Sequence, residues 1–160
     1  MSDLLRRWGV LAGAFLLAYV LDVVPLPDRL AVARPAWLAL VVIYWSMALP
    51  WRLHLSLVWL LGLLLDVLRR DLLGMHALAL TCVAFGIQRY YLQVRAFPVW
   101  QQSLLVMGVI AGYEFLLFWA EGATAAQVPP YPWPAILSSG LLWPWVFASL
   151  RGLRRRFELT

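Results

Sequence analysis

The stretch WLLGLLLDVL (residues 59–68) places a single carboxylate inside a run of leucines, and this combination decides which fold the chain can adopt. An ionised Asp is costly in apolar surroundings unless it is paired or hydrogen bonded. Leu63, Leu64 and Leu65 precede Asp66, and Val67 and Leu68 follow it. The stretch therefore predicts an apolar helix with one polar position that faces protein or water.

The composition of the whole chain is typical of an integral membrane protein. Hydrophobic residues make up 64% of the 160 positions and charged residues only 13%. A soluble domain usually carries about a quarter charged residues. The chain contains ten tryptophans and no lysine. We expect an all-α integral membrane protein, because a helix satisfies its own backbone hydrogen bonds in lipid.

Six apolar segments, separated by turn-forming and charged stretches, predict six transmembrane helices in one bundle that forms a single domain over residues 1–160. A helix needs about 20 residues to cross the hydrocarbon, and fewer where the bilayer thins. The first segment is long enough to span and five more follow it, so we do not interpret it as a signal peptide. The third segment has only 16 residues between Arg52 and Arg69, which predicts local thinning of the bilayer or a protein-buried end. The expected spans are residues 8–24, 36–50, 53–68, 72–92, 98–119 and 133–150.

The distribution of arginine predicts the orientation. An even number of spans puts both termini on one side, and that side holds nine of the 13 arginines. Because positive residues accumulate in cytoplasmic loops, we expect a multi-pass protein with both termini in the cytoplasm. The basic balance therefore indicates no nucleic-acid partner. The nine are Arg6, Arg7, Arg52, Arg89, Arg95, Arg151, Arg154, Arg155 and Arg156, and the other four are Arg29, Arg34, Arg69 and Arg70.

Motifs that carry catalysis are missing from the sequence. Without lysine there is no Schiff base and no phosphate-loop lysine, and neither H-E-x-x-H nor C-x-x-C occurs. The single Cys82 allows no intrachain disulfide. His54 and His76 follow different span boundaries, so we expect them on opposite sides of the membrane in interfacial or packing roles. The sequence predicts no enzyme, no cofactor and no metal site.

Three charged residues form a candidate intramembrane polar site: Asp66, Glu114 and Arg34. Asp66 is expected near the outer end of its helix, paired with an arginine (Arg34, Arg69 or Arg70) or with backbone N–H groups, because intramembrane acids normally face protein or water. Glu114 is expected at the same depth. One reading is a structural ion pair or hydrogen bond. The functional readings are a ligand cavity, a partner contact and a proton site.

Glycines spaced four residues apart mark candidate helix-packing faces. Gly9 and Gly13 form one G-x-x-x-G pair and Gly108 and Gly112 another, and Gly62 stands one turn before Asp66 on the same face. Small residues at this spacing let two helices approach closely. The pairs are interpreted either as packing sites within the chain or as docking faces for a helix of another protein.

Seven stretches together resemble a known family, the rod-shape-determining protein MreD family of Gram-negative bacteria. None of them is specific alone, but their order and spacing cover nearly the whole chain. They are PLPDRLAVARPAW (25–37), YWSMALPWR (44–52), GLLLDVL (62–68), LGMHALAL (73–80), WQQ (100–102), FWAEG (118–122) and LLWPW (141–145).

The resemblance implies a non-catalytic assembly protein of the cell-elongation machinery in the bacterial inner membrane. It implies direct binding of MreC, a single-span protein with a periplasmic coiled coil. It also implies a link, direct or through MreC, to MreB and to the RodA/penicillin-binding-protein synthase that makes peptidoglycan. Membrane lipids are expected neighbours, and both a monomer and a homo-oligomer are compatible with it.

The helix arrangement is expected to resemble the substrate-binding subunits of energy-coupling-factor vitamin transporters, but fold does not fix function. The alternative function is therefore a small-molecule or lipid-binding membrane subunit. In that case Asp66 and Glu114 line an outward cavity.

Overall fold

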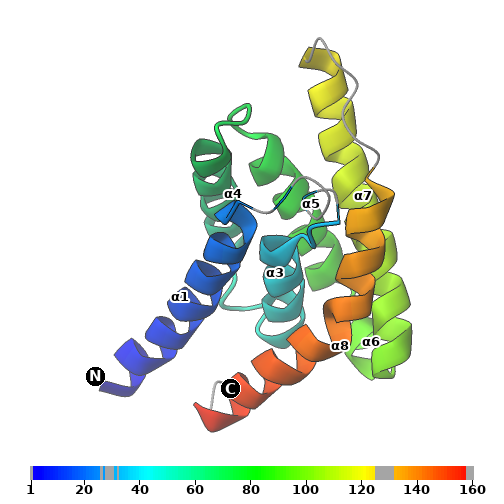
Figure 1. Cartoon of the computed structure of the whole chain (residues 1–160). Helices are drawn as coiled ribbons and strands as arrows, with labels where there is room; N and C mark the ends of the chain where they lie inside the picture. The colour runs from blue at the N-terminus through cyan, green and yellow to red at the C-terminus, as the bar shows by residue number, and fades with distance from the viewer. Residues whose placement is uncertain (1, 26, 28–30, 32, 125–131, 158–160) are drawn as a thin grey trace.

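The computed structural model describes residues 2–25, 27, 31, 33–124 and 132–157, and this part of the chain is helical, with no strand (Figure 1). Its helices are α1 (Ser2–Val23), α3 (Trp37–Ala48), α4 (Leu55–Arg69), α5 (Met75–Arg89), α6 (Tyr91–Ala96), α7 (Val99–Thr124) and α8 (Trp133–Arg156).

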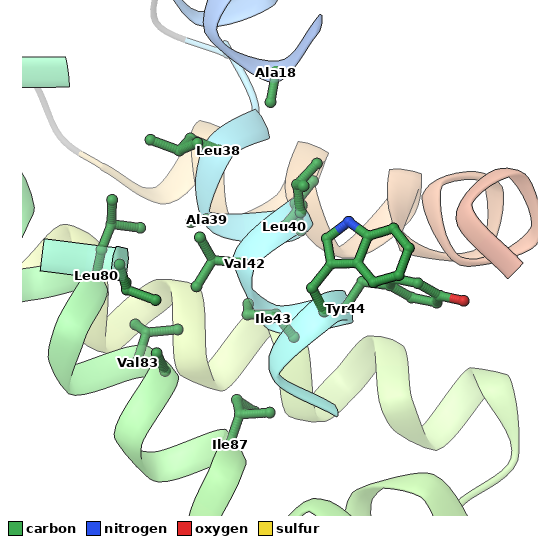
Figure 2. Packing of buried hydrophobic residues seen from close by; sticks show 14 of the residues in the cluster. Ala18, Leu38, Ala39, Leu40, Val42, Ile43, Tyr44, Leu80, Val83 and Ile87 are labelled. Carbon is green, nitrogen blue, oxygen red and sulfur yellow. The ribbon is translucent and has the colours of Figure 1, made fainter. Parts of the chain in front are cut away.

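Helix α3 is the centre of the bundle. Its sequence, WLALVVIYWSMA, is apolar on all sides, which is the pattern of a helix surrounded by other helices. Every residue from Leu38 to Ala48 is buried. Helices α1, α5, α6, α7 and α8 all pack against it. Figure 2 shows α3 side chains such as Val42 and Ile43 lying against Leu80, Val83 and Ile87 of α5.

The outside of the bundle is apolar as well. Large side chains such as Leu17, Leu60, Phe85 and Leu141 are more than half exposed, far more than a water-soluble surface usually shows. Helices α7 and α8 are long and apolar enough to cross a membrane, and residues 8–23 of α1 and all of α3 form shorter apolar helices. The apolar helices are consistent with a membrane protein.

The long helices alternate in direction, which gives the bundle two chemically different ends (Figure 1). The first turn of α1 and the last turn of α8 lie at one end. We call it the basic end, because among the described side chains it holds Arg52, Arg89, Arg95, Arg151, Arg154, Arg155 and Arg156. The opposite end, the acidic end, holds the described carboxylates Asp22, Asp66, Asp71, Glu114 and Glu121 together with Arg34, Arg69 and Arg70.

Several helix boundaries differ from the expected spans. Helix α7 continues beyond residue 119 to Thr124, and α8 continues beyond residue 150 to Arg156. The segment expected at 72–92 is divided into α5 and the short α6, with Tyr90 as the cap between them. Charged residues can stay helical beyond an apolar run, and for this reason hydropathy does not define these ends.

Candidate functional site

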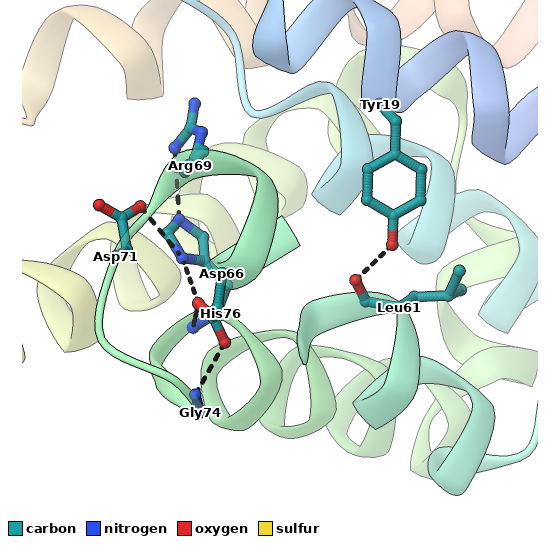
Figure 3. Close-up of polar contacts among 7 residues, drawn as sticks. All are labelled: Tyr19, Leu61, Asp66, Arg69, Asp71, Gly74 and His76. Atoms are coloured by element: carbon teal, nitrogen blue, oxygen red, sulfur yellow. Dashed lines mark hydrogen bonds and ion pairs between the residues drawn. The ribbon is translucent and has the colours of Figure 1, made fainter. Parts of the chain in front are cut away.

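Asp66 is the centre of a buried hydrogen-bond network at the acidic end. It lies in the last turn of α4 and is fully buried. Its Oδ2 accepts a hydrogen bond from the Gly74 backbone N–H at 2.8 Å, and its Oδ1 accepts one from the His76 backbone N–H at 2.9 Å. The same Oδ1 lies 2.8 Å from Nδ1 of the His76 ring (Figure 3).

The local chain path explains why these donors point at Asp66. Arg70, the C-cap residue that follows α4, adopts a left-handed conformation (φ 60°), and Gly74, the N-cap residue that precedes α5, has φ 99°. Glycine adopts this backbone at little cost. The first N–H groups of a helix have no partner within the helix and attract negative charge. Asp66 therefore caps the start of α5 from the end of α4.

The contacts of His76 define its tautomer. The guanidinium of Arg69 can only donate hydrogen bonds, and its Nη1 lies 3.3 Å from Nε2 of His76. Nε2 must therefore carry the lone pair, and the ring proton must be on Nδ1, where it is donated to Asp66. The result is a directed chain in which Arg69 donates to His76 and His76 donates to Asp66 (Figure 3).

Asp22 repeats the capping arrangement between α1 and α3. It is the penultimate residue of α1 and is only 3% exposed, and its Oδ2 accepts a hydrogen bond from the Leu38 backbone N–H at 2.8 Å. Leu38 lies in the first turn of α3. The Arg34 side chain donates to the backbone carbonyls of Asp22 and Val24, which are among the unpaired carbonyls at the end of α1. Each helix end is thus neutralised by a charge of the appropriate sign.

A cavity of about 500 Å³ lies above these caps, between α1, α5, α7 and the start of α8. Asp66 is not part of its lining, because His76 and Arg69 cover it. Glu114 reaches the cavity from α7, and within the described part of the chain its carboxylate has no hydrogen-bond partner. The charged lining residues are Asp22, Arg34, Arg69, Asp71, Glu114 and Glu121.

The cavity has the chemistry of a binding site for a polar group. Its size falls in the range of about 300–1,000 Å³ that is typical of small-ligand sites. Arginine and carboxylate groups together suit a partner that carries charges of both signs. Among the described residues, no three His, Cys, Asp or Glu side chains are arranged to hold a metal ion.

The structure separates the residues predicted for the intramembrane site. Glu114 and Arg34 line the cavity, whereas Asp66 lies behind it. Arg34 does not pair with Asp66, since its described contacts are the two carbonyls at the end of α1. Asp66 accepts hydrogen bonds from two backbone N–H groups and from His76. Arg69 donates to His76 rather than to Asp66.

The candidate glycines fall into two classes. Gly62 faces the backbone of α5: a Cβ added there meets the Cα of Ala77 at 2.2 Å. At Gly9, Gly13, Gly108 and Gly112 an added Cβ meets nothing within 4 Å. No described neighbour lies against these four glycines, and the choice between packing within the chain and docking of a helix from another protein stays a prediction.

One of the two glycine pairs, Gly108 and Gly112, lines a groove. The groove runs along α5, α6 and α7, has a volume of about 740 Å³ and is almost entirely apolar. Gly108 and Gly112 of α7 face Cys82 and Gly86 of α5 across it, so both walls carry small residues. Gly9 and Gly13 line none of the larger cavities found in the described part of the chain.

Sequence reasoning did not identify the network in which Arg69 donates both to His76 and, at 3.5 Å, to the backbone carbonyl of Asp22. Asp22 and Asp66 share a signal that could have revealed it: each is a lone acid in the last turn of an apolar helix, shortly before the next helix begins. An acid in that position can reach back to the first N–H groups of the following helix.

Comparison with known proteins identifies a family for this arrangement. The family model for the rod shape-determining protein MreD matches residues 2–153. The chain is 37% identical over 156 residues to the rod shape-determining protein MreD of Haemophilus influenzae, which covers 96% of this chain and 95% of that protein. No solved structure matches the chain significantly, so the expected likeness to vitamin-transporter subunits stays a prediction.

Proposed function

The chain belongs to the family of the rod shape-determining protein MreD, which supports a role in determining rod shape, and from this premise we propose that it acts as a non-catalytic assembly protein of the inner membrane. In this role it binds MreC directly. Together they bring MreB and the RodA/penicillin-binding-protein synthase into one complex for peptidoglycan synthesis.

The groove between α5 and α7 carries this proposal, with the single transmembrane helix of MreC as its occupant. Without a hydrophobic driving force in lipid, helices associate through close packing at small residues. The groove offers such residues on both walls, Cys82 and Gly86 on α5 and Gly108 and Gly112 on α7. The space above the α7 glycines is not filled by any described part of this chain.

Filling the groove is expected to weaken the complex. We expect Gly108→Leu/Gly112→Leu to lower MreC recovery in a pull-down by about tenfold, or about 1.4 kcal/mol. The two isobutyl groups occupy the space that the partner helix needs. The measurement compares recovery at matched membrane levels of both variants and the wild type.

The matched control is Gly9→Leu/Gly13→Leu, which makes the same change on the exposed face of α1. It is expected to leave recovery unchanged. Loss of MreC from the α1 variant alone assigns docking to α1. Unchanged recovery from both variants removes the docking proposal.

We propose the six-span topology with both termini in the cytoplasm, with spans formed by α1, α3, α4, α5, α7 and α8. Helix α4 has 15 residues, or roughly 22 Å at 1.5 Å per residue, so it needs a thinned bilayer or protein-buried ends. The described arginines divide into the two groups expected from the sequence. Arg6, Arg7 and Arg29 belong to the same prediction, but their side chains lie outside the described residues.

Reporter fusions test this topology directly. A fusion after Thr160 is expected to give a cytoplasmic signal, and a fusion within residues 123–130 a periplasmic one, because the excess of arginine retains the basic end in the cytoplasm. A periplasmic signal at Thr160 would contradict the proposed orientation and the six-span reading.

The alternative function, a small-molecule or lipid-binding subunit, is favoured by the cavity at the acidic end. There the fold gathers Asp22, Arg34, Arg69 and Glu114, which are far apart in the sequence. Purification from membranes separates the two functions. A stoichiometric single-span partner supports the assembly role, whereas a bound metabolite without a partner supports the alternative.

A further inference from the structure

A second polar cavity, of about 170 Å³, lies at the basic end between α3, α6 and α8. Three arginines from two helices line it: Arg95 on α6, and Arg151 and Arg154 on α8. Tyr44 of α3 lines the same cavity. The cavity is smaller than the roughly 300–1,000 Å³ of metabolite pockets, so it fits a small ionic group.

The charge in this cavity is uncompensated within the described part of the chain. No described carboxylate lines it, and no described ion pair involves its three arginines. Guanidinium groups remain charged and only donate hydrogen bonds. An anion between them would offset their mutual repulsion, and phosphate oxygens match their fork-like geometry.

Tyr44 of α3 adds a hydroxyl group to the lining of this cavity. The residue is only 1% exposed, and it lines the cavity together with the three arginines. Figure 2 shows the hydroxyl pointing away from the apolar core, and the residues around that cavity include Arg151 and Arg154 of α8.

The cavity is held in shape before any ligand arrives. The buried Gln102 of α7 donates from Nε2 to the carbonyls of Val94 (3.2 Å) and Phe97 (3.0 Å) at the end of α6, and its Oε1 accepts from the Trp143 indole at 3.4 Å. These bonds fix α6 against α7 and α8. The guanidinium of Arg151 lies over the Phe147 ring, 5.8 Å from its centre.

The surroundings indicate a lipid as the source of the anion. Exposed Trp51, Tyr90 and Trp100 lie around the same end of the bundle, and aromatic rings of this kind favour the level of the lipid headgroups. Anionic headgroups at that level attract clustered arginines. We propose that this cavity binds the phosphate of an anionic lipid headgroup through Arg95, Arg151, Arg154 and the Tyr44 hydroxyl.

Lipid binding by the full-length protein tests this proposal. Native mass spectrometry of detergent-purified protein titrated with phosphatidylglycerol is expected to show one retained lipid, and phosphatidylcholine is expected to bind far more weakly. Arg95→Gln/Arg154→Gln is expected to weaken retention at least about tenfold, because two of three charged donors are lost. Tyr44→Phe, which removes only the hydroxyl, is expected to weaken retention by a smaller factor.

The matched control is Arg155→Gln/Arg156→Gln, which removes the same charge from exposed positions of the same helix end outside the cavity. It is expected to retain phosphatidylglycerol like the wild type, and equal loss from both double variants would overturn the proposal. All variants must unfold at the same temperature in phosphatidylcholine, so that weaker lipid retention does not result from a folding defect. If inorganic phosphate at the same concentration competes fully with the lipid, the site belongs to a soluble phosphate and the lipid assignment is wrong.

Discussion

Replacing Asp66 with leucine is expected to give a protein that enters the membrane but neither folds stably nor restores rod shape. Asp66 accepts hydrogen bonds from two backbone N–H groups and from the His76 ring, all buried. Each buried donor left without an acceptor costs roughly 1–3 kcal/mol. In a membrane the cost is smaller, because the unfolded state in lipid also finds partners. We still expect Asp66→Leu to cause the largest loss of stability among single substitutions on α4.

Insertion itself is not expected to suffer. An Asp near a helix centre costs about 2.5–3.5 kcal/mol on insertion scales, and leucine is favourable. Asp66→Leu therefore inserts at least as well as the wild type, which separates a folding defect from an insertion defect. The measurements are thermal unfolding of the purified protein and cell shape in a strain depleted of its own copy, at equal membrane levels.

Asp66→Asn is expected to be milder than Asp66→Leu. The amide oxygen can still accept from one of the backbone N–H groups of α5, but the amide N–H₂ cannot accept from the others. Ser56→Leu is the matched control, since it makes an exposed position of the same helix more apolar. A fully functional and more stable Asp66→Leu protein would show that the capping network is dispensable.

Gly62→Ala is expected to separate α4 from α5 and to cost about 3 kcal/mol, the upper end for overpacking in a tight core. The new Cβ meets three backbone atoms of the facing helix: Cα of Ala77 at 2.2 Å, N of Ala77 at 2.6 Å and C of His76 at 2.9 Å. Backbone atoms cannot rotate away like a flexible side chain. The displaced helix start is the one that Asp66 caps, so the hydrogen bonds of Asp66 are expected to weaken too.

Gly152→Ala serves as the control for Gly62→Ala. It makes the same change inside α8, at a position where an added Cβ meets nothing within 4 Å. Alanine favours helices by about 0.8–1.0 kcal/mol over glycine, so this variant is expected to unfold at the same or a higher temperature. Equal unfolding temperatures for Gly62→Ala and the wild type would contradict the close helix crossing.

The groove along α5, α6 and α7 and the cavity at the acidic end differ in chemistry, which affects how a complex forms. The groove with Gly108 and Gly112 is apolar along the helices. The cavity with Glu114 and Arg34 is polar and lies at the acidic end. A single-span partner that docks in the groove has its extramembrane part near one end of the bundle. From the proposed orientation and docking, we expect a periplasmic part of that partner on the side of the acidic cavity.

The sequence alone was sufficient to predict that the chain is helical and that its charges divide between two ends. Long apolar segments predict helices wherever lipid or a protein core excludes water, because the backbone must satisfy its own hydrogen bonds there. The positions of arginine predicted which charges share an end of the bundle. The sequence also showed that Asp66 needs polar partners, since that requirement follows from the cost of burying a charge.

Only the tertiary structure decided which partners those are. Asp66 bonds the backbone of Gly74 and His76, and backbone donors are present at every residue except proline, so they leave no mark in the sequence. The contacts of the glycines also could not be predicted from the sequence. Gly62 and Gly108 each stand four residues before another candidate position, yet only Gly62 meets a neighbouring backbone. Spacing along one helix determines which residues share a face, but the helix that covers that face is determined by the packing of the whole bundle.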